Sequence, residues 1–256
     1  MIDRIWAICR NIYLEGFRQK VFTSAVIFAV ILIVLSVFLG PFSLGEISKI
    51  VRDFGLAISS LLSIFIIVTV GSAILYRDLE RRTIYTIVTR PIRPREIVIG
   101  KFFGLVLLVI SLTFAMAIIQ QLVILLSEGR FDLAIMIAPL FNCFEIMIMT
   151  GVLLLFASFS SAAFSSIMTV ILFIVGHASP DLKLFADTVK SPLLKTVSTA
   201  FYYILPNLEN FNLRLDVVYR LPLAADQAVY VISYGIIYIV LLLFLSVIIF
   251  ESREFK

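Results

Sequence analysis

The sequence consists of apolar runs, most of them about as long as a bilayer is thick, joined by short polar segments. An α-helix needs about 20 consecutive apolar residues to cross the hydrocarbon core of a membrane. The chain is therefore predicted to be an all-α polytopic membrane protein with six transmembrane helices, forming one transmembrane domain over residues 1–256. The expected spans are residues 21–40, 54–76, 102–126, 133–156, 163–176 and 227–250.

Composition agrees with this class and excludes several others. Hydrophobic residues make up 61% of the chain and charged residues 15%, against about 25% charged in average soluble proteins. The formal charge of +4 is confined to segments between helices, which cannot build a compact basic surface, so no nucleic-acid partner is expected. Cys9 and Cys143 are far apart in predicted depth, so neither a disulfide nor a metal site is expected.

The N-terminal segment, residues 1–20, reads as an amphipathic helix that lies in the membrane interface. Its polar face carries Asp3, Arg10 and Arg18, and the apolar run after it does not read as a cleaved signal peptide. This helix can anchor the first span or contact a partner, and the sequence leaves both roles open. At 100° per residue its apolar stripe is Ile2, Ile5, Trp6, Cys9, Ile12, Tyr13 and Phe17.

The distribution of basic residues predicts the orientation. With six spans both termini fall on one side, together with the loop 77–101, and this side holds 13 Lys and Arg residues against 8 on the other. Five of those eight lie in one long segment, 177–226, where charge has least influence on topology. We therefore expect cytoplasmic termini, a cytoplasmic loop 77–101 and an extracytoplasmic segment 177–226.

The extracytoplasmic segment contains a predicted short helix. Apolar residues between Pro192 and Pro206 are spaced for one helical face, over thirteen residues. That length is too short to span, so this helix is expected to lie at the outer leaflet or dip into it. A capping role and a role in substrate passage both stay open. Asp226 is placed to cap the N-terminus of the last span.

The loop 77–101 is the most informative polar segment, with seven of the chain's 21 Lys and Arg residues. Residues 79–89 can form a short helix that the Arg90–Pro91 step ends, since a residue before Pro avoids the α region. Pro94 suits the first turn of a second helix, and Glu96 suits its positive end. Pro91 and Pro94 thus form a predicted hinge. A loop that only sets topology would need the positive charges but not this geometry.

Two stretches carry a family resemblance. ERRTIYTIVTRPIRPREIVIGKF, from Glu80 to Phe102, resembles the permease subunits of ABC-2 type transporters, although Arg82 stands where many relatives have Gly. YYILPNLENFNLR, from Tyr202 to Arg214, is similar to permeases of the nitrous-oxide reductase maturation and gliding motility type. The resemblance covers essentially the whole chain, with an interfacial helix, six spans, a cytoplasmic coupling helix and a partly re-entrant outer segment.

The resemblance implies a dimer of permease chains, here a homodimer, bound to two copies of a cytoplasmic ATPase subunit in a bacterial or archaeal plasma membrane. ATP and Mg²⁺ would bind to that subunit, and no cofactor is expected on this chain. The chain has no G-x-x-x-x-G-K-[ST] phosphate loop, so it is not expected to be an enzyme itself. The implied docking residues are Leu79, Glu80, Arg81, Arg82, Thr83, Ile84, Tyr85, Ile87 and Val88.

Polar residues inside the spans are the other candidates. Glu145 is a carboxylate at membrane depth, which usually faces the bundle interior or a wet cavity. Glu145 can line a substrate pathway, make a dimer contact or form a structural hydrogen bond, and the sequence leaves these three roles open. Asn142, on the same helix face, can share the hydrogen-bond network of Glu145. His177, the only histidine, is expected to be interfacial, with Asp181 as its only obvious companion. The hydroxyls of residues 158–166 are expected to satisfy a tight turn rather than to catalyse.

Three functions from different classes compete. The leading hypothesis is the membrane subunit of an ATP-driven exporter. An intramembrane enzyme acting on lipid or peptide is disfavoured, because the sequence contains neither H-E-x-x-H nor G-x-S-x-G. A passive scaffold or channel is the third alternative.

Overall fold

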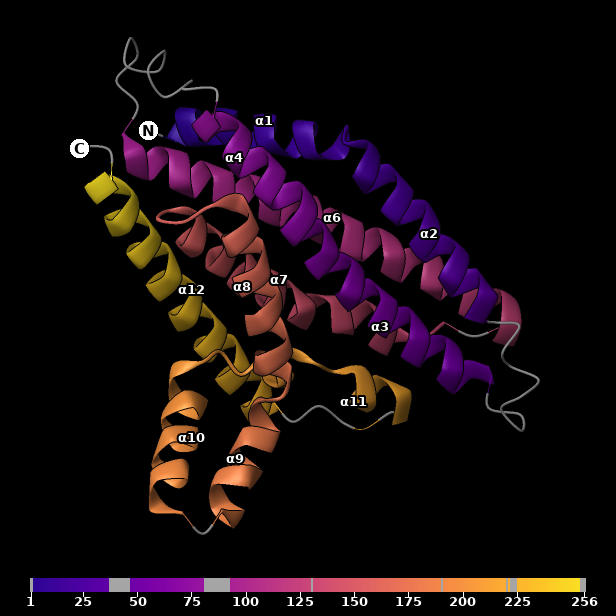
Figure 1. Ribbon diagram of the computed structural model, residues 1–256. Coiled ribbons are helices and arrows are strands. Elements are labelled where there is room, and N and C mark those ends of the chain that lie inside the picture. Colours follow the sequence, from indigo (N-terminus) through magenta and orange to yellow (C-terminus); the bar gives the residue numbers. More distant parts are fainter. Residues whose placement is uncertain are drawn as a thin grey trace.

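A computed structural model describes residues 2–36, 47–80, 93–129, 131–189, 191–219, 221 and 225–253. All regular structure in these residues is helical, which confirms the predicted all-α class (Figure 1). The elements are α1 (Ile2–Phe17), α2 (Lys20–Ser36), α3 (Ile47–Ile66), the π-helical turn η2 (Ile67–Gly71), α4 (Ser72–Glu80), α6 (Pro94–Glu128), α7 (Leu133–Ala157), α8 (Ala162–His177), α9 (Ser179–Thr188), α10 (Pro192–Ile204), the 3-10 helix η3 (Leu208–Phe211), α11 (Arg214–Tyr219) and α12 (Ala225–Arg253).

Long apolar helices make this a multi-pass membrane protein. Four are long and apolar enough to cross a bilayer, and two further pairs qualify only as bent units. In these pairs α1 meets α2 at 62° and α8 meets α9 at 59°. The chain therefore has four to six candidate spans. The four long ones are Lys49–Tyr76, Pro94–Leu126, Ile135–Ala157 and Asp226–Ser252.

Several boundaries differ from the sequence prediction. Of the expected first span 21–40, the described part is helical to Ser36. The second span was expected at residue 54, yet α3 begins at Ile47, so Arg52 and Asp53 lie on a helix rather than in a loop. Both residues are ion-paired, and this pairing lets the helix continue through charged positions. Asp226 lies in the first turn of α12 instead of capping it, a position where a carboxylate still suits the helix dipole.

The start of α6 agrees closely with the prediction. Pro94 occupies the first turn, where its missing N–H leaves no hydrogen bond unmade. The Glu96 carboxylate accepts a hydrogen bond from the backbone N–H of Arg93 at 3.2 Å and lies 3.8 Å from the Arg4 guanidinium. The helix then runs without interruption through the third expected span to Glu128, where Gly129 ends it in the left-handed conformation with φ 67°.

The N-terminal helix α1 packs against α6 through glycines. A Cβ atom on Gly104 would lie 2.6 Å from the Ile12 Cβ and 2.8 Å from the Cys9 carbonyl oxygen, so only glycine permits this approach. Cys9 and Ile12 are buried as a result. Trp6, from the same predicted stripe, stays exposed. The amphipathic helix therefore presents part of its apolar stripe to α6 and part to the surroundings.

The second long helix contains the π-helical turn η2, which the sequence did not indicate. Gly71 in this turn packs against Leu153 of α7, and the backbone oxygen of Val68 accepts a hydrogen bond from Ser166 of α8 at 3.4 Å. π-Turns inside α-helices are frequent at functional sites because they shift the following residues around the helix axis. Here the turn lies between the charged start of α3 and the end of α4.

The segment after α8 forms a hairpin and then returns to the bundle. The predicted thirteen-residue helix is confirmed as α10, and α9, which was not predicted, lies beside it away from the bundle (Figure 1). Leu208 and Phe211 of η3 are fully buried instead. A Cβ on Gly176 would lie 2.6 Å from Leu208, so η3 fits closely against the end of α8. Leu208, Phe211 and Leu213 of the segment 206–214 are therefore part of the core.

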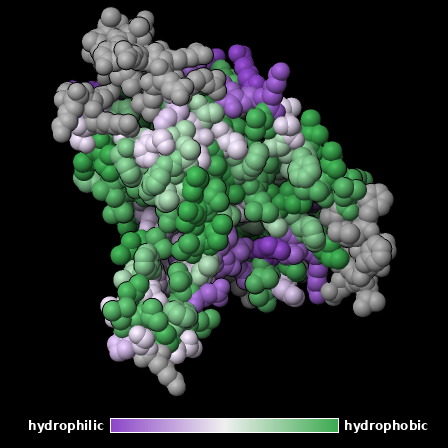
Figure 2. Space-filling model, viewed as in Figure 1, coloured by the Kyte–Doolittle hydropathy of each residue, from purple (hydrophilic) through white to green (hydrophobic). Residues whose placement is uncertain are grey.

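The two described ends, Ile2 and Arg253, lie at the same end of the bundle as the end of α4 and the start of α6 (Figure 1). This arrangement agrees with termini and loop 77–101 on one side of the membrane; which side that is stays a prediction. Figure 2 shows hydrophobic residues across the middle of one face and hydrophilic residues gathered near opposite ends, as expected where a lipid bilayer surrounds the middle of a protein.

Candidate functional site

The loop 77–101 can be located only by its two ends. Leu79 and Glu80 form the end of α4, and Pro94 begins α6. The other predicted docking and hinge residues lie outside the described residues: Arg81, Arg82, Thr83, Ile84, Tyr85, Ile87, Val88 and Pro91. The coupling helix therefore stays a prediction from sequence.

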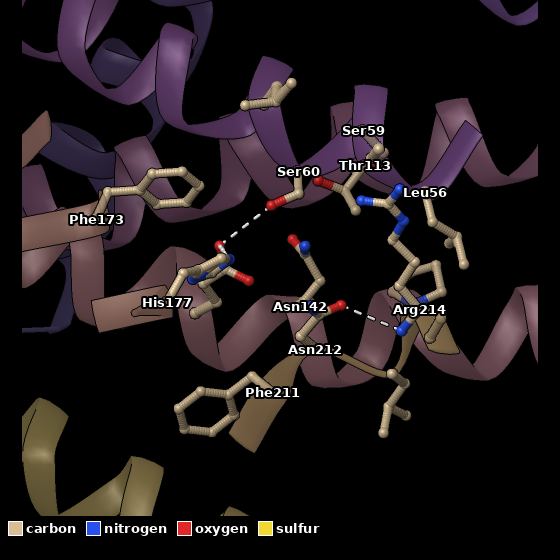
Figure 3. Close-up of a pocket in the computed structure, with 16 residues that line it drawn as sticks. Leu56, Ser59, Ser60, Thr113, Asn142, Phe173, His177, Phe211, Asn212 and Arg214 are labelled. Atoms are coloured by element: carbon tan, nitrogen blue, oxygen red, sulfur yellow. Dashed lines mark hydrogen bonds and ion pairs between the residues drawn. The ribbon is translucent and has the colours of Figure 1, made fainter. Parts of the chain in front are cut away.

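The described residues contain a mostly apolar cavity of about 200 Å³ inside the bundle, lined also by several polar side chains (Figure 3). It lies between α3, α6, α7, the end of α8 and the segment 206–214, which includes η3. It extends from about the middle of α6 and α7 toward the end of α8, in the part of the bundle away from the termini. The polar side chains that line it include Ser60, Asn142, Glu145, His177, Asn212 and Arg214.

Glu145 is the most buried charged group of this cavity. It lies about halfway along α7, and only 5% of it is exposed. The Ser60 hydroxyl of α3 donates a hydrogen bond to Glu145 Oε1 at 3.2 Å (Figure 3). A carboxylate at this depth is costly unless it is compensated. One neutral hydroxyl donor is partial compensation, so the carboxylate keeps acceptor capacity toward the cavity.

His177 lies next to Glu145, which corrects the expectation from sequence. Its Nε2 is 3.7 Å from Glu145 Oε1, whereas Asp181, the expected companion, is exposed on α9. This separation exceeds a hydrogen bond. The imidazole packs against the Phe173 ring at 4.6 Å between centroids, and its Nδ1 is buried without a hydrogen-bond partner among the described residues. The imidazole at the end of α8 therefore lies beside Glu145 of α7; whether it also lies in the membrane interface stays a prediction.

Asn142 lines the same cavity one helical turn before Glu145. Within the described residues, the Glu145 carboxylate accepts its hydrogen bond from Ser60 rather than from Asn142. The Asn142 Oδ1 atom is buried and has no hydrogen-bond partner in the described part of the chain. The two residues are thus together in space, and the amide of Asn142 is available to a molecule that enters the cavity.

Arg214 forms the charged rim of the cavity on the side of the segment 206–214. Its guanidinium donates two hydrogen bonds to the Asp53 carboxylate of α3, one of them from Nη2 to Oδ2 at 2.8 Å. These hydrogen bonds raise the pKa of Arg214 above its usual value, so the group stays protonated. The Asn212 side chain accepts a hydrogen bond from the Arg214 backbone N–H at 3.1 Å (Figure 3). The ion pair between Arg214 and Asp53 holds the segment 206–214 to α3.

A second ion pair, more buried than the first, is made by the neighbouring residue of the same helix. Arg52 Nη2 is 2.8 Å from Asp132 Oδ2, and only 3% of the Arg52 side chain is exposed. Gln120 of α6 donates hydrogen bonds to the backbone oxygens of Val51 and Arg52 at 3.3 and 3.1 Å. The start of α3 is therefore held to α6 and to the residue preceding α7 by polar contacts that the sequence prediction did not contain.

In the residues that the structure describes, no group of three or more His, Cys, Asp and Glu side chains is placed to hold a metal ion. Cys9 and Cys143 are both free and buried, on α1 and α7. One carboxylate, one imidazole and several neutral donors and acceptors in a small cavity are groups suited to binding.

The chain matches no protein-family model, and it matches no curated protein. Its sequence and structure therefore establish a multi-pass helical membrane protein, and the more specific function is a proposal.

Proposed function

We propose that this chain is the membrane-spanning permease subunit of an ABC-2 type transporter, which couples ATP hydrolysis on a separate cytoplasmic subunit to export of a substrate. The observation that carries the proposal is the sequence from Glu80 to Phe102, a basic, proline-containing segment with the pattern of a coupling helix. In support, the described helices that flank it, α4 and α6, end and begin at the end of the bundle that carries both termini.

The flanking helices give this segment a mechanical path to the cavity. α4 continues through η2 into α3, which carries Ser60 and Asp53. α6 carries Thr113, which lines the cavity and lies within hydrogen-bond distance, 3.1 Å, of Ser63 on α3. A displacement of the loop by a partner would move both helices, and rigid-body movement of this kind is a common form of coupling. The π-turn η2 lies on this path, between the loop and the cavity.

The proposal includes the partners implied by the resemblance. Two ATPase subunits would bind two permease chains, a homodimer, with ATP and Mg²⁺ on the ATPases. The loop 77–101 would face the cytoplasm, and the cavity with Glu145 would lie toward the outer side of the plasma membrane. Substrate would reach the cavity or a surface formed with the second chain.

Purification of the full chain tests this proposal. A tagged chain, extracted from its native membrane in mild detergent, is expected to retain a protein with a phosphate loop and to hydrolyse ATP. Replacement of Arg81, Thr83 and Tyr85 by Glu, Ala and Ala should remove the ATPase while the chain still folds. The matched control carries Ala at Lys183, Thr196 and Tyr203, residues on the outer α9–α10 hairpin, and should keep it.

Two results would overturn the proposal. One is a folded chain that is reproducibly purified without any ATP-binding protein, under conditions that preserve known membrane complexes. The other is an ATPase that remains bound to the triple variant of the loop. Turnover of a lipid or peptide by the chain alone would favour the intramembrane-enzyme alternative.

A further inference from the structure

The walls of the cavity combine apolar and aromatic surfaces with one carboxylate. Phe173 and Phe211 lie on two sides of it, and Leu61 and Pro139 add aliphatic surface (Figure 3). At about 200 Å³ the cavity is smaller than the ~300–1,000 Å³ of usual drug-sized sites. A ligand of this site is therefore small, or is the small end of a larger molecule.

The charges around the cavity favour a cation. Arg214 is neutralised by its two hydrogen bonds to Asp53. Glu209 on η3 is close enough for its negative charge to act on both Glu145 and His177. The buried Glu145 carboxylate receives one neutral hydrogen bond, from Ser60, among the described residues. An anion would meet the Glu209 charge and the acceptor oxygens of Glu145, whereas a cation would be attracted to both and would favour the ionised form of the Glu145 carboxyl group.

The hydrogen-bonding groups favour a cation that carries N–H donors. Glu145 retains acceptor capacity, and Asn142 Oδ1 is a buried acceptor without a partner in the described residues. An ammonium group has three donors and no acceptor, which matches such a set. The apolar side chains of Phe173 and Phe211 suit a cation with a short apolar body. A metal ion fits less well, since the described residues hold no cluster of three His, Cys, Asp or Glu.

We propose that this cavity binds an ammonium group, with Glu145 as its counter-ion and Asn142 as a second acceptor. The group can belong to a free small amine or to the amino headgroup of a lipid, because both present the same ammonium on a short apolar stem. Binding of an ammonium needs no ATPase, so its failure would leave the transporter proposal untouched.

Binding of butylammonium to the purified full chain in detergent tests the site by calorimetry. Wild-type chain should bind butylammonium saturably, and should bind neither butanol nor butyrate at the same concentration. Glu145→Gln keeps the shape and removes the charge, so it should weaken butylammonium binding at least tenfold. Asp181→Asn removes an exposed carboxylate on the same side and should leave the affinity unchanged.

A second variant keeps the test valid if the Glu145→Gln chain does not fold. Ala57 lines the cavity on α3, and Ala57→Leu should fill part of the volume and abolish binding while Glu145 stays in place. Equal binding of butylammonium and butanol, or binding that is unchanged in Glu145→Gln or in Ala57→Leu, would overturn the proposal. Absence of butylammonium binding to the wild-type chain would do the same.

The source of the ammonium is distinguished in lipid nanodiscs. If the natural ligand is a lipid headgroup, phosphatidylethanolamine discs should lower the apparent affinity for butylammonium at least tenfold relative to phosphatidylglycerol discs. If it is a free amine, the affinity should be equal in both. In either case the Glu145→Gln variant should lose the binding seen in phosphatidylglycerol discs, and retention of that binding would contradict the assignment.

Discussion

The buried ion pair between Arg52 and Asp132 allows a sharp test of how the bundle is held together. Its nitrogen–oxygen distance is 2.8 Å, and the two side chains are 3% and 13% exposed. Removal of one partner of a buried pair takes away the opposite charge that the other partner is buried against and costs about 3–5 kcal/mol. Arg52→Met keeps much of the apolar volume, so this penalty should dominate its effect.

The pair between Arg214 and Asp53 is the natural comparison, because it has similar geometry but 40% and 32% exposure. Exposed pairs contribute about 0–1 kcal/mol. Arg214→Met should therefore destabilise the chain far less than Arg52→Met. The double variant Arg52→Met with Asp132→Leu should recover most of the loss, since replacement of a whole buried pair by apolar residues is often neutral.

These differences in stability can be measured by unfolding the chain in mixed micelles with increasing sodium dodecyl sulfate, with circular dichroism as the readout of helix content. A change in stability appears as a shift of the unfolding midpoint while the slope of the transition stays constant. The single Trp6 lies on α1, so its fluorescence would report another region. A cost of Arg52→Met below about 1 kcal/mol, or one no larger than that of Arg214→Met, would refute the reasoning from burial. A double variant as unstable as Arg52→Met alone would show that the pairing is not the cause.

Three further predictions follow from packing and topology. Phe211→Ala should lower the free energy of unfolding by about 3–5 kcal/mol in the same assay, because Phe211 is 1% exposed. Leu193→Ala on the α9–α10 hairpin should have little effect, because Leu193 is 71% exposed. Equal effects would show that Phe211 is not part of the core. Gly104→Val should lower the free energy of unfolding by about 1–3 kcal/mol through overpacking against α1. Because α1 is displaced, the emission maximum of Trp6 should also move. An unchanged emission spectrum and an unchanged stability would contradict the packing. Cysteine at Lys183 should react with a membrane-impermeant maleimide in intact cells and cysteine at Ser252 only after lysis, and the reverse pattern would invert the topology.

Much of the fold could be predicted because membrane helices follow from length and hydropathy. The expected spans at 102–126, 133–156 and 227–250 lie within α6, α7 and α12. Local signals also succeeded where one residue type determines the geometry, as at Pro94. These features depend on residues close together in sequence, which is the information that a single chain provides.

Other features depend on contacts between distant segments and were missed. The polar stretch with Arg52 and Asp53 becomes helical because Asp132 and Arg214 approach from other elements. His177 has Glu145 as its neighbour because α8 packs beside α7, and the positions along one helix suggest only Asp181. The π-turn η2 likewise reflects packing of Gly71 against Leu153. The placement of Glu145 and Asn142 in one cavity agrees with their spacing, and their role stays a prediction.

The central claim is that the segment after α4 is held by a nucleotide-driven partner in the cytoplasm. A photo-crosslinking amino acid at position 85, in place of Tyr85, tests it in living cells, with the same group at Tyr203 on the outer hairpin as the control. The account predicts a crosslink from position 85 to a protein with a phosphate loop, and none from position 203. Crosslinks from position 85 to lipid, to this chain alone or to extracytoplasmic proteins would contradict it.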